Sequence, residues 1–494
     1  MSHREQLLER LTAETWDVAI IGGGATGLGA AVDAVSRGFR TVLIEQSDFA
    51  KATSSRSTKL IHGGVRYLKQ GNISLVRESL HERELLLKNA FGLVRPLEFI
   101  IPTFSFPERL FYATGLKAYD FLAGKRGMAS SKMLSTNEVQ QRVSTIQTDR
   151  LSGGVSYYDA QFDDARLVMA MASSVTHHGG VPLNYVKCVG LLKQGERLAG
   201  VTAEDVETGR QYEVKAKAFI NATGIFTDSM RHLDDPLAKP MMKVSRGSHL
   251  VVDRSFLPGE TAIIIPKTSD GRVVFIIPWH GAVLIGTTDI AEPSPILDPA
   301  PTEEEVIFLL ECANRFLTRQ VKHSDIRSMF CGLRPLVSSG HDGSSTSKLS
   351  RDHVIRTSES GLVTITGGKW TTYRRMGSDA VDTAIKVAGL GHRPSTTQTL
   401  HLTGNLHDSP QQPQTTDSVT DEFVLHAIRE EQARTIEDVL SRRCRLLLLD
   451  AQGAINVAPR VAALLATELQ LSPEQTSAQL ENFVKLAKTY LPHQ

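Results

Sequence analysis

A run of hydroxyl side chains near the start of the chain ends in a histidine, two glycines and an arginine. Residues 53–68 read TSSRSTKLIHGGVRYL and hold five hydroxyl side chains in their first six positions. Gly63 and Gly64 let a backbone lie flat against an aromatic ring, where a Cβ would clash. The stretch therefore predicts a loop that holds a charged ligand with a flat ring. Four of its hydroxyls can donate hydrogen bonds to a pyrophosphate or to the edge of such a ring: Thr53, Ser54, Ser55 and Ser57.

A glycine-rich turn, GGGATG, lies between a predicted strand and a predicted helix. In this pattern Gly22 permits a tight turn, Gly24 lets the backbone approach a pyrophosphate, and Gly27 lets the helix pack on the strand. Ala25 and Thr26 of this turn are predicted cofactor contacts, and the N-terminus of the helix that follows then faces the phosphates. The turn indicates a dinucleotide-binding site, and the alternative is a merely structural glycine turn.

Two further features narrow the choice of dinucleotide. Glu45 ends the next predicted strand, where it can accept hydrogen bonds from both ribose hydroxyls and would repel a 2′-phosphate. NADP is therefore disfavoured, and FAD and NAD remain. A late return strand that ends in FINATG, residues 219–224, favours FAD, because many flavoproteins close the cofactor site with such a segment. Thr223 and Gly224 are therefore predicted cofactor contacts, although an ordinary strand-to-loop turn is the alternative.

Basic residues indicate where a second anion would bind. Gly367 and Gly368 follow the predicted strand LVTIT and again allow close backbone approach. Lys369 is a compact cation that suits a phosphate or the flavin N1–C2=O locus. Thr371 opens the following helix, whose N-terminus favours negative charge at the flavin carbonyl. Arg334 precedes a proline, which holds it in an extended conformation.

The elements that must position these residues fall into two kinds. Residues 17–45 predict a strand–helix–strand unit of a parallel sheet, and residues 164–224 predict a second α/β stretch. Residues 241–290 predict an antiparallel sheet. A polar linker, 404–420, precedes a helical module whose last helix begins after Ser472. The fold class is therefore α/β plus α+β.

Composition excludes several classes of protein. The 494-residue chain has a formal net charge of +1, so no global field attracts nucleic acid. Its four cysteines form no CxxC pair, which argues against an iron–sulfur cluster, a zinc ribbon or a disulfide scaffold, and no metal site is expected. The first residues lack an apolar stretch, so no secretory signal is expected. No run of about 18 apolar residues occurs, so no spanning helix is expected.

Four motifs resemble one family of flavoproteins. They are GGGATGLGAAVDAVSRG at 22–38, TSSRSTKLIHGGVRYL at 53–68, GLRPL at 332–336 and TGGKWTTYR at 366–374. Together they closely resemble the FAD-dependent, membrane-associated glycerol-3-phosphate dehydrogenases of the D-amino-acid-oxidase-like superfamily. The resemblance covers nearly the whole chain, including the helical module.

The resemblance and the sequence patterns together give a division into domains. We expect a Rossmann-like FAD-binding domain, an antiparallel-sheet substrate cap domain and a helical C-terminal domain. The predicted boundaries are 15–100, 150–240 and 325–400 for the FAD-binding domain, 101–149 and 241–324 for the cap domain, 404–420 for the linker, and 421–494 for the C-terminal domain.

The reaction that the resemblance implies is oxidation of sn-glycerol 3-phosphate to dihydroxyacetone phosphate, with hydride transfer from C2 to FAD N5. The base that takes the hydroxyl proton is expected to be His62, with His249 as the competitor. Arg334 is expected to stabilise the developing alkoxide as well as to bind substrate. By resemblance the substrate-binding residues are Arg66, Tyr67, Arg334, Arg351 and Lys369.

The electron acceptor and the location follow from the same resemblance. Because the sequence offers no iron–sulfur ligands, membrane ubiquinone or menaquinone is the expected acceptor. The aromatic segment 108–122 is a candidate membrane-surface patch, and a packed cap-domain helix is the alternative. We expect a protein of the cytoplasm that is bound peripherally to the cytoplasmic face of the inner membrane. The sequence leaves the oligomeric state open, with a homodimer as one candidate. The rival functions are an oxidase that uses oxygen, a flavin amine or amino-acid oxidase, and a non-redox flavin protein.

Overall fold

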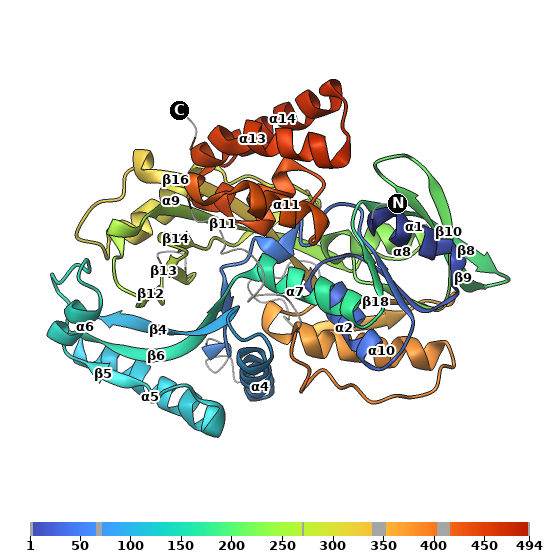
Figure 1. Ribbon diagram of the computed structural model, residues 1–494. Coiled ribbons are helices and arrows are strands. Elements are labelled where there is room, and N and C mark those ends of the chain that lie inside the picture. Colours follow the sequence, from blue (N-terminus) through green and yellow to red (C-terminus); the bar gives the residue numbers. More distant parts are fainter. Residues whose placement is uncertain (1–2, 66–71, 269–270, 338–351, 403–414, 493–494) are drawn as a thin grey trace.

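Two large β-sheets form the body of the protein (Figure 1). The computed structural model describes residues 3–65, 72–268, 271–337, 352–402 and 415–492. The first sheet has eight strands in the order β17-β18-β10-β1-β2-β7, with β8 and β9 continuing from β10. Their bounds are β1 (Trp16–Ile21), β2 (Thr41–Ile44), β7 (Val181–Leu183), β8 (Val186–Gln194), β9 (Arg197–Asp205), β10 (Gln211–Asn221), β17 (His353–Thr357) and β18 (Leu362–Gly367).

The centre of the first sheet is parallel. β1 pairs in parallel with β10 and β2, β2 with β7, and β10 with β18. All four residues of β2 are buried, as expected for a short apolar strand covered on both faces. Helix α2 (Ala25–Ser36) packs between α7 (Asp164–His177) and α10 (Tyr373–Val387) on this sheet. The predicted strand–helix–strand unit at 17–45 is therefore confirmed.

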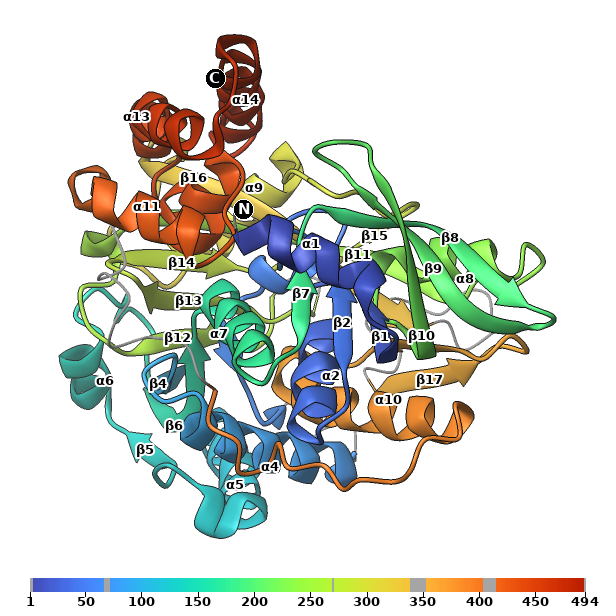
Figure 2. The same cartoon turned by 45° about the vertical axis from the view of Figure 1, so that its right-hand side comes forward.

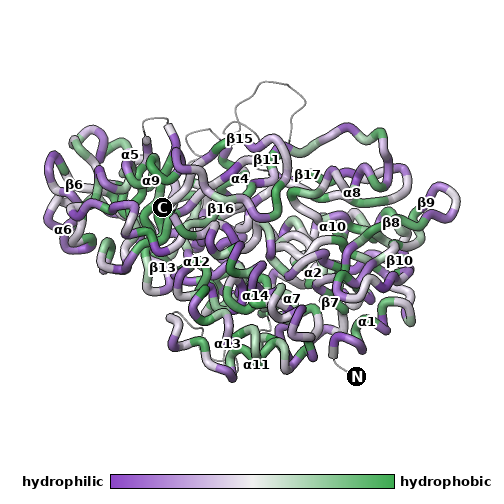
Figure 3. Tube along the Cα trace, turned by 90° about the horizontal axis from the view of Figure 1, so that it is seen from above, coloured by the Kyte–Doolittle hydropathy of each residue, from purple (hydrophilic) through white to green (hydrophobic). Residues whose placement is uncertain are grey.

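The edge of the first sheet is antiparallel. β8, β9 and β10 form a meander within the predicted α/β stretch at 164–224. The turn between β8 and β9 is hydrophilic and projects from the body (Figures 2 and 3). Helix α1 (His3–Ala13) lies across β10 and β7, and α8 (Thr227–Asp234) packs near β18.

The second sheet has ten strands and is mostly antiparallel. Its main order is β15-β11-β14-β13-β12-β4-β6-β3, with β16 paired to β11 and β5 paired to β6. Helices α4, α5, α6 and α9 surround it, and Thr302 is the N-cap of α9. The bounds are β3 (Leu60–Ile61), α4 (Ile73–Asn89), β4 (Val94–Thr103), α5 (Phe106–Ala123), β5 (Lys132–Leu134), α6 (Thr136–Arg142), β6 (Gly153–Phe162), β11 (Met242–Asp253), β12 (Ala262–Ile265), β13 (Val274–Trp279), β14 (Ala282–Gly286), β15 (Ile290–Glu292), α9 (Glu303–Asn314) and β16 (Ile326–Val337).

Sheet membership departs from the predicted domain boundaries. Three whole strands of the second sheet, β3, β6 and β16, and most of β4 come from segments assigned to the FAD-binding domain by sequence. Their partners lie far away in the chain: Leu97 pairs with Asp159, and His249 pairs with Phe330. Local patterns identify a strand but not its distant partner, so these strands were placed beside their sequence neighbours. The division into domains stays a prediction, whereas the fold class is confirmed.

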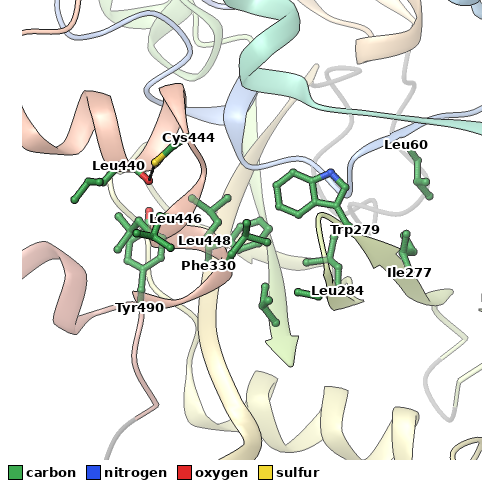
Figure 4. Packing of buried hydrophobic residues seen from close by; sticks show 14 of the residues in the cluster. Leu60, Ile277, Trp279, Leu284, Phe330, Leu440, Cys444, Leu446, Leu448 and Tyr490 are labelled. Carbon is green, nitrogen blue, oxygen red and sulfur yellow. Dashed lines mark hydrogen bonds between the residues drawn. The ribbon is translucent and has the colours of Figure 1, made fainter. Parts of the chain in front are cut away.

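The last helices form a C-terminal module, residues 415–492, that packs on the second sheet (Figures 1 and 2). It contains α11 (Asp421–Arg429), a π-helical turn Asp438–Arg443, α12 (Leu446–Leu449), α13 (Ala451–Leu469) and α14 (Pro473–Lys488). Ser472 caps α14 through the Gln475 N–H, as predicted. Figure 4 shows Leu446 and Leu448 beside Phe330, so the module and the second sheet share one apolar core. Residues 404–414, which make up most of the predicted linker 404–420, lie outside the described residues.

Candidate active site

The glycine turn after β1 is closely packed. Gly22 has φ +112°, and a Cβ there would lie 2.5 Å from the Ala222 carbonyl oxygen. A Cβ at Gly27 would lie 1.9 Å from the Gly22 carbonyl oxygen. Gly24 is the N-cap of α2, so the helix begins at the end of this turn and points its free N–H groups outward from it. The turn has the geometry that phosphate binding at a helix N-terminus requires.

Glu45 lies immediately after β2 and faces this turn. Its Oε2 accepts a hydrogen bond of 2.6 Å from the Gly23 N–H, and its Oε1 accepts one of 2.9 Å from the Ser47 N–H. Burial raises the pKa of Glu45, and these two N–H groups oppose that shift. The contacts hold the acid at the end of β2, where a ribose bound along the turn would meet it.

The hydroxyl-rich loop, residues 53–59, packs against the same turn. The Ala25 N–H donates to Ser54 Oγ at 3.0 Å, which places this hydroxyl at the N-terminus of α2. Thr53 donates its hydroxyl proton to the Leu333 carbonyl oxygen at 2.7 Å, and Ser57 donates its own to Asp164 at 2.7 Å. A hydroxyl has one proton to donate, and here both protons are used within the protein. Donation by Thr53 and Ser57 to the cofactor stays a prediction. Ser55 is buried, and its carbonyl oxygen accepts from Lys59.

The two predicted flavin-facing glycine pairs lie next to each other. Thr371 donates to the His62 carbonyl oxygen at 3.3 Å, which joins the turn after β18 to the end of β3. Gly64, Gly367 and Gly368 have φ values of +76°, +79° and +73°, a region that favours glycine.

Gly63 has a structural reason of its own to lack a side chain. A Cβ there would lie 2.1 Å from the Tyr119 hydroxyl oxygen. Packing within the protein therefore already explains why position 63 needs a glycine. Contact of Gly63 with the flavin stays a prediction.

Arg334 and Lys369, two of the predicted substrate-binding cations, contact different parts of the protein. Arg334, on β16, donates to the Arg246 and Thr288 carbonyl oxygens at 3.1 and 3.0 Å and lies 3.7 Å from the Asp289 carboxylate. Lys369 donates to the Ser79 hydroxyl on α4 at 3.2 Å. Three predicted substrate residues lie outside the described residues: Arg66, Tyr67 and Arg351.

His249 is the histidine that the structure places next to the hydroxyl-rich loop. It is 2% exposed, its Nε2 lies 3.0 Å from Thr58 Oγ1, and its ring stacks on Phe330 with centroids 4.8 Å apart. Burial lowers the pKa of His249 well below its usual value, and the positive charges of Lys59 and Arg334 lower it further. The ring is therefore neutral, with one of its nitrogens unprotonated. Thr58 and Lys59 were not predicted as site residues; their place in the 53–68 run was the available signal.

The residues around the turn fit an FAD molecule. The N-terminus of α2 and Ser54 offer donors for a pyrophosphate, Glu45 offers an acceptor for the ribose, and the 60–64 and 367–371 segments bring glycine backbone together. No group of three or more histidine, cysteine or acidic side chains in the described part of the chain is arranged to hold a metal ion.

Known proteins share this arrangement. Residues 17–374 match the family model of the FAD dependent oxidoreductases, and residues 395–476 match that of the C-terminal domain of alpha-glycerophosphate oxidase. The chain belongs to the FAD-dependent oxidoreductase family. It is an enzyme that uses FAD, as the sequence motifs predicted.

Relatives within this family are named after one activity. The mitochondrial glycerol-3-phosphate dehydrogenase of Mesocricetus auratus is 38% identical over an alignment that covers 98% of this chain and 75% of that protein. The mitochondrial glycerol-3-phosphate dehydrogenase of Arabidopsis thaliana is 35% identical over an alignment that covers 98% of this chain and 88% of that protein. The crystal structure of the Bacillus halodurans glycerol-3-phosphate dehydrogenase with FAD superposes with a TM-score of 0.80 at 26% identity, covering 99% of this chain and 97% of that chain. The stated resemblance is therefore confirmed.

The packing of the glycine turn predicts the result of adding one methyl group. Gly27→Ala is expected to abolish FAD retention, because its Cβ would meet backbone 1.9 Å away. The ratio of flavin to protein absorbance after purification measures the effect. Gly115→Ala, on α5, is the control, since its Cβ would meet no described atom within 4 Å. A Gly27→Ala protein with full flavin content would contradict the assignment.

Proposed function

We propose that this enzyme oxidises the C2 hydroxyl of sn-glycerol 3-phosphate to the ketone of dihydroxyacetone phosphate. The observation that carries the proposal is the 38% identity to a protein named glycerol-3-phosphate dehydrogenase over 98% of this chain. Bound FAD supplies the acceptor for the hydride that leaves C2. The protein residues bind and orient the substrate and take the hydroxyl proton.

Arg334 is the proposed group that stabilises negative charge on the C2 oxygen. Carbonyl oxygens of two other segments fix its guanidinium, so little reorganisation is needed when charge develops. Its ion pair with Asp289, 3.7 Å away, keeps this charge balanced in the absence of substrate. Lys369, with Arg66 and Arg351, is proposed to bind the phosphate, because guanidinium groups can hold a phosphate through two parallel hydrogen bonds.

The proposed base is His249, with His62 as the alternative. Its neutral ring is fixed by Thr58 on one side and Phe330 on the other. The His249 ring packs against Gly286, and Arg334 donates to the hydroxyl of the next residue, Thr287, so the proposed base and the proposed alkoxide stabiliser are neighbours. His62 is half-buried, and its backbone oxygen accepts from Thr371.

Anaerobic reduction of the flavin tests the substrate. Glycerol 3-phosphate is expected to bleach the bound flavin, whereas glycerol and D-alanine leave it oxidised. Arg334→Ala should slow the bleaching by about 100-fold and weaken substrate binding, because it removes a fixed cation from the developing charge. Arg327→Ala is the matched control: it lies on the same strand and pairs with Asp253 and Asp450. Bleaching by D-alanine instead would replace the proposal with an amino-acid oxidase.

Exchange of each histidine for glutamine tests the base. His249→Gln is expected to slow flavin reduction by at least about 100-fold, and His62→Gln by much less. Because the pKa of His249 lies well below 6.5, it stays able to accept a proton as the pH falls through neutrality. The wild-type reduction rate should therefore persist to pH values below 6.5. The reverse ranking of the two variants would assign the base to His62.

A membrane quinone is the proposed electron acceptor, and α5 is the proposed contact with the membrane surface. No helix within the described ranges combines the length and apolar character needed to cross a bilayer. On α5, Leu116 and Tyr119 are buried, whereas Phe106, Phe111 and Phe121 are 57%, 62% and 83% exposed. The helix therefore packs through one set of side chains and exposes aromatic rings through another, and its contact with a membrane is our proposal. Such a patch on an amphipathic helix is typical of proteins that bind the lipid interface.

Reoxidation of the reduced enzyme tests this acceptor. The double variant Phe111→Ser and Phe121→Ser is expected to lose binding to anionic phosphatidylglycerol vesicles, and with it fast reoxidation by ubiquinone in those vesicles. Its anaerobic reduction by glycerol 3-phosphate should be unchanged. Leu237→Ser is the control, because Leu237 is 90% exposed but lies elsewhere. Oxygen is the alternative acceptor, since the family model that matches the C-terminal domain is named after an oxidase. Reoxidation by oxygen without vesicles that is as fast as reoxidation by ubiquinone would identify the enzyme as an oxidase.

A further inference from the structure

Three buried arginines of the C-terminal module reach into the FAD-binding part of the protein. Arg442, Arg443 and Arg445 are each at most 1% exposed. Arg442 and Arg443 both donate to the carboxylate of Asp48, which follows β2. Arg445 instead reaches the hydroxyl-rich loop, so the three side chains serve two different places.

Arg445 is held against this loop by several groups. Its Nη2 donates to the Ser55 carbonyl oxygen at 2.8 Å and to Asp164 Oδ1 at 2.9 Å. Its Nη1 donates to the Ser441 carbonyl oxygen at 2.8 Å, within the module. Its guanidinium lies over the Trp279 ring, 5.5 Å from the centroid. Its φ is +69°, a conformation that a residue other than glycine keeps only where its surroundings hold it.

Lys59 binds the same two acceptors from inside the loop. Its Nζ donates to the Ser55 carbonyl oxygen at 2.6 Å and to Asp164 Oδ2 at 2.7 Å, and the side chain is 0% exposed. Ser57 donates both its N–H and its hydroxyl to Asp164, at 3.0 and 2.7 Å. The loop is thus closed around one carboxylate, with one cation from the loop and one from the C-terminal module.

Two side chains of the closed loop contact residues of the proposed cofactor and catalytic sites. Ser54 lies at the N-terminus of α2, and Thr58 lies against His249. We propose that Arg445 is a positioning residue for this enzyme: together with Lys59 and Asp164 it holds the 53–59 loop so that Ser54 and Thr58 meet the cofactor turn and the base. The C-terminal module therefore takes part in catalysis through the loop. The effect on rate rests on the proposed function, whereas the effect on FAD binding does not.

Attachment of the module does not require Arg445 at this place. Arg442 and Arg443 already connect it to Asp48, and Leu446 and Leu448 bury it beside Phe330 (Figure 4). Arg443 is therefore a matched control: it is equally buried, lies two residues away and pairs with an aspartate of the same part of the protein.

The test compares Arg445→Lys with Arg443→Lys in the full-length holoenzyme. Both are expected to lower the melting temperature by similar amounts. Only Arg445→Lys should slow anaerobic flavin reduction by sn-glycerol 3-phosphate, by about tenfold or more. It should also shift the pH profile of that rate and raise the dissociation constant of FAD. A normal rate, profile and FAD affinity in Arg445→Lys, or equal changes in both variants, would overturn the proposal.

Ser57→Ala covers the case in which Arg445→Lys yields no folded enzyme. This exchange loosens the hold of the loop on Asp164 without touching the module. It should give the same changes in rate and FAD affinity with a nearly normal melting temperature, and normal kinetics would again overturn the proposal. If the wild-type flavin is not reduced by sn-glycerol 3-phosphate, the proposed substrate fails. The role of Arg445 is then decided by the FAD dissociation constants alone.

Discussion

The buried carboxylate of Asp164 is the group on which the arrangement of the site depends. It is 0% exposed and accepts hydrogen bonds from Lys59, Ser57 and Arg445, and from the N–H of Ala165 at the start of α7. A buried charge without partners is strongly destabilising. Each donor comes from a segment that the carboxylate therefore holds in place: the hydroxyl-rich loop, the C-terminal module and the helix on the first sheet.

Other charged groups where the C-terminal module meets the rest of the protein are also paired with opposite charges. Asp48 binds Arg442 and Arg443, Glu431 binds Arg166, and Lys51 lies between Glu437 and Asp298. Buried ion pairs of this kind contribute little net stability compared with apolar packing, and their better-attested effect is to specify one arrangement. The leucines of α12 supply the apolar part of the contact with the second sheet (Figure 4). Apolar burial thus attaches the module, and the ion pairs fix its register against the loop.

Features encoded by neighbouring residues could be predicted from the sequence. The β1–α2–β2 unit, the glycine turn, the Ser472 cap and the aromatic character of α5 each follow from a short pattern. What could not be predicted depends on residues far apart. Asp164 and Arg445 are 281 positions apart, and Thr53 and Leu333 are 280 apart. No pattern in TSSRST shows that two of its hydroxyls bind the protein itself, and none in RRCR shows which arginine reaches the loop.

The cations that close the loop also set the electrostatics of the proposed base. Burial and the charge of Arg445 lower the pKa of Lys59 to about 7, against the opposing charges of Asp164 and Asp163. Lys59 therefore gains its proton as the pH falls through neutrality, which is the range in which a histidine of ordinary pKa would begin to charge. Its positive charge, with that of Arg334, then disfavours a second proton on His249. His249 stays neutral through this range mainly because it is buried, and the charges of Lys59 and Arg334 add to that effect. The cations that fix the loop thus add to the burial that keeps His249 unprotonated.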